Sequence, residues 1–133
     1  MKNPTIAYLG APYSHPNPEV RKFRLDSTSK LASQLFSQGR FVYSPLTHNI
    51  SLSNFANEVA SFDIWGKFDL AMLSKCDELL IYKLPGWEQS NGLKNEIDFA
   101  NENHIPITYI SYEEDEKQIA KGTHSKPACE SIE

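Results

Sequence analysis

Four short apolar segments alternate with longer segments of helical periodicity along this 133-residue chain. The predicted strands cover residues 5–9, 41–43, 77–83 and 106–110, and the predicted helices between them cover residues 18–38, 62–74 and 91–103. The run Leu79-Leu80-Ile81-Tyr82 is apolar throughout, which is typical of a parallel strand buried on both faces. We therefore expect an α/β fold, a small doubly wound sheet of four to five mainly parallel strands flanked by helices, Rossmann-like or flavodoxin-like.

The sequence also indicates where the first helix begins and ends. Asn17-Pro18-Glu19 offers an N-cap, a proline at the first helical position and an acid in the first turn. Gly39 suits the position just after the last turn. Residues 44–49 are predicted to turn away from the second strand, and residues 50–60 to form a loop with one helical turn.

Length, charge and cysteine use limit the class of protein. The chain suits one domain, residues 1–111, followed by a polar and flexible tail, residues 112–133. A net charge of −4 argues against a nucleic-acid polymer or an anionic membrane as partner, and no apolar run approaches the ~20 residues of a membrane span. Cys76 and Cys129 are interpreted as free thiols of a reducing compartment. With no signal peptide before the first strand, a cytoplasmic protein is expected.

Two carboxylates are the first candidates for chemistry. Glu96 follows the small-residue turn Ser90-Asn91-Gly92 in the first turns of a helix, and ligands of open parallel sheets bind outside the carboxyl ends of the strands. The helix dipole is expected to favour the ionised form of Glu96, which a nucleophile needs. Asp69 lies among large apolar residues, which are expected to raise its pKa and to suit it to acid–base work. The alternatives are an acid that only complements the helix dipole and an outward-facing helix residue.

The first strand and its loop contribute a second group of candidates. Tyr8 lies near the end of the strand, where its hydroxyl either orients a carboxylate or belongs to the core. Gly10-Ala11-Pro12 ends the strand and leaves room for a ligand to approach the backbone. Tyr13-Ser14 then places hydroxyl and N–H groups toward a ligand.

Single polar and aromatic residues complete the set. Ser90 is a candidate anion ligand, because its hydroxyl and the free N–H groups of the following helix converge; the alternative is a plain N-cap. His48 is either a donor to the ligand or a bystander, and Trp87 either stacks on a base or packs at a subunit contact. Arg21 and Arg24 are candidate phosphate partners, although surface positions are favoured for both.

Several common sites are missing from the sequence. His15, His48, His104 and His124 form no metal-type cluster, so no metal is predicted. The chain has no Gly-x4-Gly-Lys-Ser/Thr loop, no Gly-x-Gly-x-x-Gly fingerprint and no Gly-x-Ser-x-Gly elbow. No cofactor is therefore predicted.

Four motifs follow one another along the chain: Tyr8-Leu9-Gly10-Ala11-Pro12-Tyr13-Ser14, Phe68-Asp69-Leu70, Cys76-Asp77-Glu78-Leu79, and Gly86-Trp87-Glu88-Gln89-Ser90-Asn91-Gly92 continuing to Glu96. Their order and spacing resemble the nucleoside 2-deoxyribosyltransferase-like superfamily over roughly residues 5–110. That superfamily includes deoxyribosyltransferases and nucleoside 5′-monophosphate N-glycosidases. The resemblance is closest to an uncharacterised branch, often phage or bacterial.

The resemblance implies an enzyme that cleaves or transfers an N-glycosidic bond of a nucleoside or (deoxy)nucleoside 5′-monophosphate. Glu96 then forms the covalent glycosyl intermediate, Asp69 handles the proton on the departing base, and Tyr8 positions the nucleophile. Ser90 stands where transferases of free nucleosides tend to have an acid, which implies a phosphorylated substrate, since a carboxylate would repel a phosphate dianion. Gly92 belongs to the same substrate-binding turn.

The resemblance also implies a homodimer or higher homo-oligomer in which a neighbour completes the site, with Phe62 and Trp65 as candidate contacts. Two other functions stay open. One is a nucleotide-binding or sensing module without turnover. The other is hydrolysis of a larger nucleotide such as NAD, which also contains an N-glycosidic bond.

Overall fold

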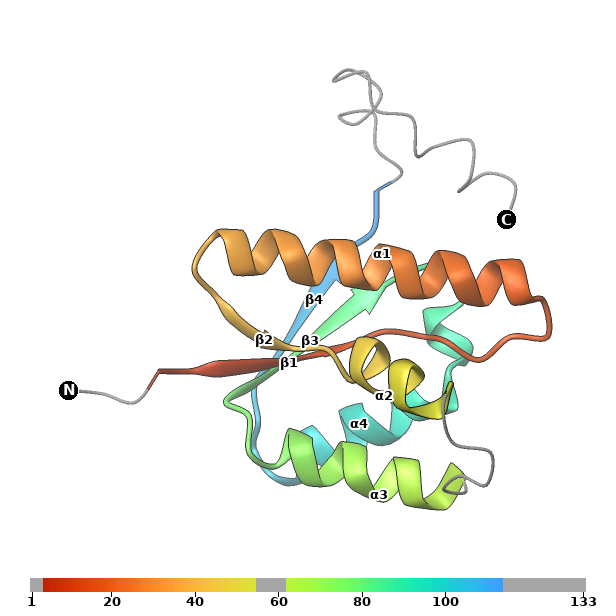
Figure 1. The fold of residues 1–133 in the computed structure, drawn as a ribbon. Helices are drawn as coiled ribbons and strands as arrows, with labels where there is room; N and C mark the ends of the chain where they lie inside the picture. Colours follow the sequence, from red (N-terminus) through yellow and green to blue (C-terminus); the bar gives the residue numbers. More distant parts are fainter. Residues whose placement is uncertain (1–3, 55–61, 114–133) are drawn as a thin grey trace.

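The computed structural model describes residues 4–54 and 62–113, which form a four-stranded, all-parallel sheet covered by helices on both faces (Figure 1). The strands are β1 (Ile6–Gly10), β2 (Phe41–Tyr43), β3 (Glu78–Lys83) and β4 (Ile107–Ser111). The helices are α1 (Pro18–Ser37), α2 (Pro45–Ser53), α3 (Phe62–Leu73) and α4 (Asn91–Glu102), with a short 3-10 turn, η1, at Trp87–Gln89. The predicted α/β fold is confirmed.

The strand order β2-β1-β3-β4 determines where a ligand can bind. The chain leaves β1 through α1, on one face of the sheet, and leaves β3 through α4, on the other face (Figure 1). Because these connections diverge, a crevice opens between the carboxyl ends of the two strands. Gly10 and Ile81, which are paired across β1 and β3, mark that edge of the sheet.

Each strand contributes to both faces of the core because successive side chains point in opposite directions. The face toward α3 and α4 buries Tyr8, Leu73, Leu79, Ile81, Leu93 and Ala100. The face toward α1 buries Ala7, Leu9, Leu35, Val42 and Leu80. At about 1.5–3 kcal/mol for each fully buried large apolar side chain, these two layers hold the helices against the sheet.

Helix α1 begins at the residue that the sequence predicts and ends one residue earlier than predicted, at Ser37. The Asn17 side chain accepts a hydrogen bond from the backbone N–H of Glu19 at 2.9 Å, and Pro18 is the first helical residue. Gly39 adopts φ +87°, which ends the helix and directs the chain into β2. The orientation of α1 along the sheet is thus encoded locally.

The prediction for residues 44–49 is wrong, because they belong to α2 rather than to a turn. Ser44 caps this helix, accepting from the N–H of Thr47 at 3.4 Å, and Pro45 is its first residue. This Ser-Pro start is the same signal as Asn17-Pro18, so it was present in the sequence. The later part of the predicted loop, residues 55–60, lies outside the described residues.

At the end of the described chain, Tyr112 packs against the domain. Its ring lies 5.7 Å from that of Phe23 on α1 and 6.0 Å from that of Tyr82 on β3. The rest of the predicted tail, residues 114–133, lies outside the described residues. Among the helices that are described, none combines the length and the apolar character that a membrane crossing requires.

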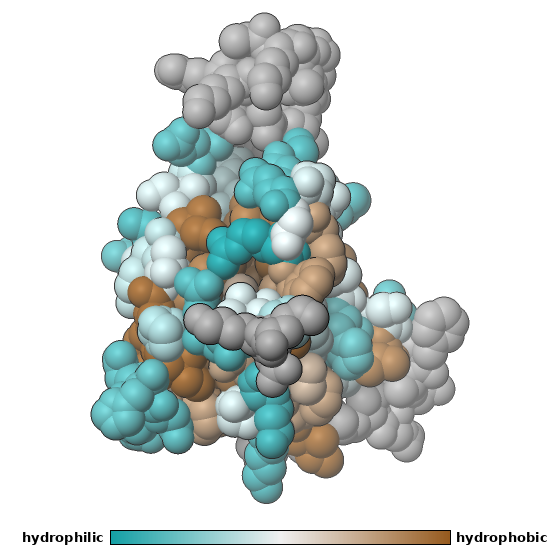
Figure 2. Space-filling view, turned by 90° about the vertical axis from the view of Figure 1, so that its left-hand side faces the viewer, coloured by the Kyte–Doolittle hydropathy of each residue, from teal (hydrophilic) through white to brown (hydrophobic). Residues whose placement is uncertain are grey.

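The amino ends of the strands form a surface where hydrophobic and hydrophilic residues are mixed (Figure 2). Ile6 at the start of β1, Phe41 at the start of β2 and Phe36 near the end of α1 are exposed. The crevice between β1 and β3 lies at the opposite end of the sheet. The candidate site is therefore separate from these exposed apolar side chains.

Candidate functional site

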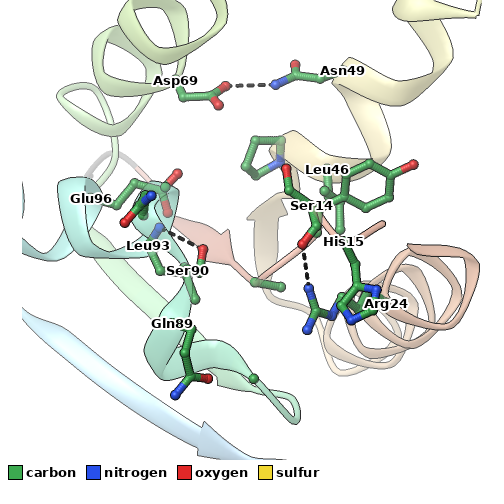
Figure 3. Close-up of a pocket in the computed structure, with 16 residues that line it drawn as sticks. Ser14, His15, Arg24, Leu46, Asn49, Asp69, Gln89, Ser90, Leu93 and Glu96 are labelled. Carbon is green, nitrogen blue, oxygen red and sulfur yellow. Dashed lines mark hydrogen bonds between the residues drawn. The ribbon is translucent and has the colours of Figure 1, made fainter. Parts of the chain in front are cut away.

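A cavity of about 670 Å³ lies at the carboxyl ends of β1 and β3. It is lined by Ala11, Tyr13, Ser14, His15, Arg24, Pro45, Leu46, Asn49, Asp69, Gly86, Gln89, Ser90, Asn91, Gly92, Leu93 and Glu96. Figure 3 shows Asp69 of α3 and Glu96 of α4 on one side of this space, with Ser14 and Arg24 across from Ser90. Residues far apart in the sequence thus share one cavity of the size that small-molecule ligands occupy.

Glu96 is held against the end of β1. The Tyr8 hydroxyl donates to Glu96 Oε2 at 2.7 Å, from a ring that is fully buried. A side chain at Gly10 would not fit, because a Cβ there would lie 2.8 Å from Glu96 Oε1 and 3.0 Å from Leu93 Cδ2. Gly10 therefore contributes by its small size, which lets the carboxylate lie directly over the backbone.

Burial dominates the ionisation of Glu96. It raises the pKa of this carboxyl to about 8, with a further increase from the charge of Asp69, against the opposing effect of the Tyr8 hydrogen bond. The expectation that Glu96 is ionised is therefore wrong near neutral pH. Glu96 is the sixth residue of α4, beyond the first turn where the dipole acts strongly, and desolvation outweighs what remains of the dipole.

Asp69 has a different set of partners. Asn49 Nδ2 donates to Asp69 Oδ1 at 2.8 Å, which links α2 to α3 (Figure 3). Burial raises the pKa of Asp69, as predicted, while the Asn49 hydrogen bond and the nearby His48 oppose the increase. The two cavity carboxyls therefore differ in their donors, an amide for Asp69 and a phenol for Glu96.

Two tyrosines lie beneath the carboxyls. The rings of Tyr8 and Tyr43 are 5.7 Å apart, and burial raises the pKa of both, that of Tyr43 to about 12. The Tyr43 hydroxyl is buried and has no hydrogen-bond partner among the described residues. Of these two tyrosines, only Tyr8 donates a hydrogen bond to Glu96, so removing each hydroxyl in turn separates the effect of this bond from that of burial.

The start of α4 forms another wall of the cavity. Ser90 is the N-cap, and its Oγ accepts from the N–H of Leu93 at 3.2 Å. Ser90, Asn91 and Gly92 all line the cavity. The N–H groups of the first helical turn have no earlier turn to bond, so this wall presents donors and the positive end of the helix dipole.

Arg24 lies opposite this helix start, and the sequence-based preference for a surface position is wrong. Only 7% of the residue is exposed. Its Nη1 donates to the Ser14 carbonyl at 3.0 Å and its Nη2 to the Pro85 carbonyl at 3.1 Å. The ion pairs found within residues 4–54 and 62–113 do not include Arg24. A buried cation that borders a cavity without a carboxylate partner favours an anionic ligand.

The other predicted residues fall into two groups. Ala11, Tyr13 and Ser14 line the cavity. Gly10 and Tyr8 support Glu96 from behind, and Pro12 is buried without lining the cavity. His48 and Trp87 do not line it either: the His48 ring stacks on Phe68 at 5.6 Å, and the Trp87 ring packs 5.8 Å from that of Tyr109.

Sequence reasoning did not identify Asn49 or Gln89 as lining residues, and it missed Pro45 and Leu46, which line the cavity from the start of α2. The Ser44-Pro45 helix start was the available signal. It would have placed Asn49 one turn after Pro45, near the carboxyl end of β2. In the described part of the chain, no group of three His, Cys, Asp or Glu side chains is placed to hold a metal ion.

Comparison with known families matches residues 5–112 to a family model described as "Domain of unknown function (DUF1937)". The matched residues include every described strand and helix and every residue that lines the cavity. A search of curated proteins found no match.

Proposed function

We propose that this chain, which belongs to the DUF1937 family, breaks the N-glycosidic bond of a nucleoside or nucleoside 5′-monophosphate. The observation that carries the proposal is a pair of carboxyls in one cavity, Glu96 and Asp69, each with its own hydrogen-bond donor. Two carboxyls in different environments can divide the nucleophile and acid–base roles of glycosyl chemistry.

Glu96 serves as the nucleophile. Its ionised carboxylate attacks C1′, and the electrons of the C1′–N bond pass to the base nitrogen, which takes a proton from Asp69. The product of this step is a glycosyl ester on Glu96 together with the free base. Tyr8, 2.7 Å from Oε2, orients the carboxylate and stabilises its ionised form.

The second step releases the sugar. Water loses a proton to Asp69 and attacks C1′, the ester bond breaks, and Glu96 leaves as a carboxylate. When a second base replaces water, the same step transfers the sugar. Two displacements at C1′ retain its configuration in both cases.

A 5′-phosphate on the substrate is supported by the charges opposite the carboxyls. Arg24 supplies a buried cation, and the start of α4 supplies N–H donors and the Ser90 hydroxyl. Phosphate binds readily at helix N-termini and to guanidinium groups. We therefore propose a nucleoside 5′-monophosphate as the preferred substrate, with its phosphate between Arg24 and Ser90.

One observation favours a second function, a nucleotide-binding or sensing module without turnover. With its pKa raised to about 8, Glu96 is largely protonated near neutral pH and is then a poor nucleophile. Tight nucleotide binding without release of base would support this module. Release of base whose rate increases as Glu96 ionises would support the enzyme.

The test is chromatography of a panel of nucleosides, nucleoside monophosphates and NAD after incubation with the protein, with and without an acceptor base. We expect free base from a monophosphate with the wild type and none with Glu96→Gln or Asp69→Asn. Asp98→Asn is the matched control, because it removes an exposed carboxylate from the same helix as Glu96. Base release by Glu96→Gln at the wild-type rate would contradict the mechanism.

We also propose a homo-oligomer, supported by the family resemblance described above, and a cytoplasmic location, supported by the interpretation of the two cysteines as free thiols of a reducing compartment. Half-buried Trp65 on α3 is the described candidate for a subunit contact. Light scattering coupled to size-exclusion chromatography measures the oligomeric state, and a monomer at assay concentration would contradict the first proposal. Cell fractionation tests the location.

A further inference from the structure

Two consecutive residues of α2 connect to Asp69 through hydrogen bonds. His48 Nδ1 lies 2.8 Å from Asn49 Oδ1, and Asn49 Nδ2 donates to Asp69 Oδ1 at 2.8 Å (Figure 3 shows the second bond). The chain of contacts thus runs from an exposed imidazole, through an amide that lines the cavity, to a cavity carboxyl.

The chemistry of the three groups sets the direction of both bonds. An ionised carboxylate only accepts, so Asn49 presents its Nδ2–H to Asp69 and turns its oxygen toward His48. An amide oxygen also only accepts, so the proton of neutral His48 is on Nδ1. Each group therefore fixes the orientation of the next.

Aromatic packing holds the His48 ring in place. The ring stacks on Phe68, with centroids 5.6 Å apart and planes 26° apart, and lies 6.0 Å from the ring of Tyr43. Phe68 immediately precedes Asp69 on α3, so the ring that supports the His48 imidazole and the Asp69 carboxyl belong to the same helical turn. His48 is exposed but not free to rotate without losing this contact.

We propose that Asn49 is the positioning residue for Asp69, that His48 fixes the Asn49 amide, and that the pair directs the proton of Asp69 to Oδ2. The use of this proton in base departure rests on the proposed function. The hydrogen-bond coupling itself does not.

The position of the proton follows from the geometry. A proton on Oδ1 would face the Asn49 N–H, so the acid form of Asp69 carries its proton on Oδ2. When the C1′–N bond breaks, the base nitrogen gains the electron pair and takes the Oδ2 proton, which leaves Asp69 ionised. The Asn49 bond then becomes charge-assisted, so Asn49 stabilises the product of proton transfer.

Asn49 therefore makes Asp69 a stronger acid. The other titratable groups that face Asp69 are Glu96 of α4, Tyr8 of β1 and Tyr43 of β2, in addition to His48 of α2. Asn49→Leu substitutes none of these groups but removes the acceptor for His48 Nδ1, so the part of the Asp69 pKa change that exceeds the change in His48→Phe reports the loss of the amide donor.

The experiment is a carboxyl ¹³C NMR titration of the full chain labelled at aspartate, with the Asp69 signal assigned by its absence in Asp69→Asn. Asn49→Leu removes both amide groups at similar volume, and Asn49→Asp keeps the shape but exchanges the donor for a second carboxyl, whose negative charge adds to the rise in the pKa of Asp69. His48→Phe keeps an aromatic ring over Phe68 without the Nδ1 donor. Ser53→Ala is the control, because among the described residues the Ser53 hydroxyl bonds only backbone carbonyls within α2.

We expect the pKa of Asp69 to rise by about one unit or more in Asn49→Leu and Asn49→Asp. A smaller rise is expected in His48→Phe, and none in Ser53→Ala. In the pH profile of kcat/KM, the limb that reports Asp69, the acid limb because Glu96 ionises at higher pH, moves to higher pH by the same amount, which a purely structural role of Asn49 would not produce. Thermal unfolding identifies any variant that does not fold, and the remaining variants still decide the outcome.

An unchanged Asp69 titration in the folded Asn49 variants would overturn the proposal, whatever the activity. If the pKa of Asp69 in His48→Phe equals that of the wild type, His48 has no part in positioning Asp69. If the wild type releases no base from any nucleotide while the Asp69 pKa responds as expected, the positioning of Asp69 stands and the proposed function fails. The two ideas are thus tested separately.

Discussion

Under the proposed N-glycosidase function, replacing Tyr8 by Phe should slow catalysis by making Glu96 harder to ionise. The substitution keeps the buried ring and deletes only the hydroxyl that donates to Glu96 Oε2 at 2.7 Å. That hydrogen bond opposes the effect of burial on the pKa of Glu96. Without it, burial and the charge of Asp69 remain, and the carboxyl ionises at higher pH.

The expected magnitude follows from the strength of the bond. A hydrogen bond to a charged group is worth about 1.5–3 kcal/mol, which corresponds to about 1–2 pKa units. With the pKa of Glu96 at about 8, roughly one-tenth of the wild type is ionised at pH 7. The variant would have about 10- to 100-fold less ionised Glu96 at that pH, and kcat/KM should fall by the same factor.

The assay is kcat/KM for base release between pH 6 and pH 10, together with the carboxyl ¹³C titration of Glu96. The control is Tyr43→Phe, which deletes a hydroxyl that has no partner within residues 4–54 and 62–113, from a ring whose centroid lies 5.7 Å from that of Tyr8. We expect Tyr43→Phe to leave the pKa of Glu96 nearly unchanged, and Tyr8→Phe to regain much of the lost rate at high pH. A loss in Tyr8→Phe that is the same at every pH would refute the reasoning.

Three further predictions concern stability, space and charge. Because the pKa of Glu96 is raised in the folded protein from 4.5 to about 8, its contribution to stability is complete below pH 4.5 and is lost as the pH rises through 8. The melting temperature of Glu96→Gln relative to the wild type should therefore be higher at pH 8.5 than at pH 5, by on the order of 10 °C. An equal difference at the two pH values would contradict this. Gly10→Ala should lower the free energy of unfolding, measured in urea, by about 1–3 kcal/mol. It should also lower kcat by about 100-fold, because the new Cβ displaces Glu96 Oε1. A kcat equal to that of the wild type would contradict the close contact between Gly10 and Glu96. Arg24→Met should raise KM for a nucleoside 5′-monophosphate about 10- to 100-fold more than KM for the unphosphorylated nucleoside. The control is Arg21→Met, because the Arg21 guanidinium does not line the cavity, and it should not have this effect. Equal effects of Arg24→Met on both substrates would show that Arg24 does not recognise the phosphate.

The fold could be predicted from the sequence because its signals are local. Apolar runs mark the strands, and Asn17 and Gly39 mark the ends of α1. The place of the two carboxyls in the cavity could be predicted for a similar reason: Glu96 lies near the start of the helix that follows β3 and its loop, and Asp69 lies in an apolar segment. The helix α2 was missed even though Ser44-Pro45 is a local signal of the same kind.

The remaining site residues depend on contacts that no local pattern contains. Arg24 is buried because two carbonyls, from Ser14 and from Pro85, 61 residues away, satisfy its guanidinium. Asn49 reaches Asp69 across 20 residues and between two helices. The pKa of Glu96 depends mainly on how completely the folded chain excludes solvent from its carboxyl. The sequence indicates the helix dipole but not this burial, which has the larger effect.

The two carbonyls that bind Arg24 come from the loops on either side of the crevice, one after β1 and the other after β3. A single planar guanidinium therefore spans the gap and sets the distance between the two loops before any ligand arrives. Gly86, at φ +89°, lets the second loop approach so closely that a Cβ there would lie 2.5 Å from Nη2. The width of the entrance is thus set by the length of one side chain, and a ligand that fits it binds without first having to draw the loops together.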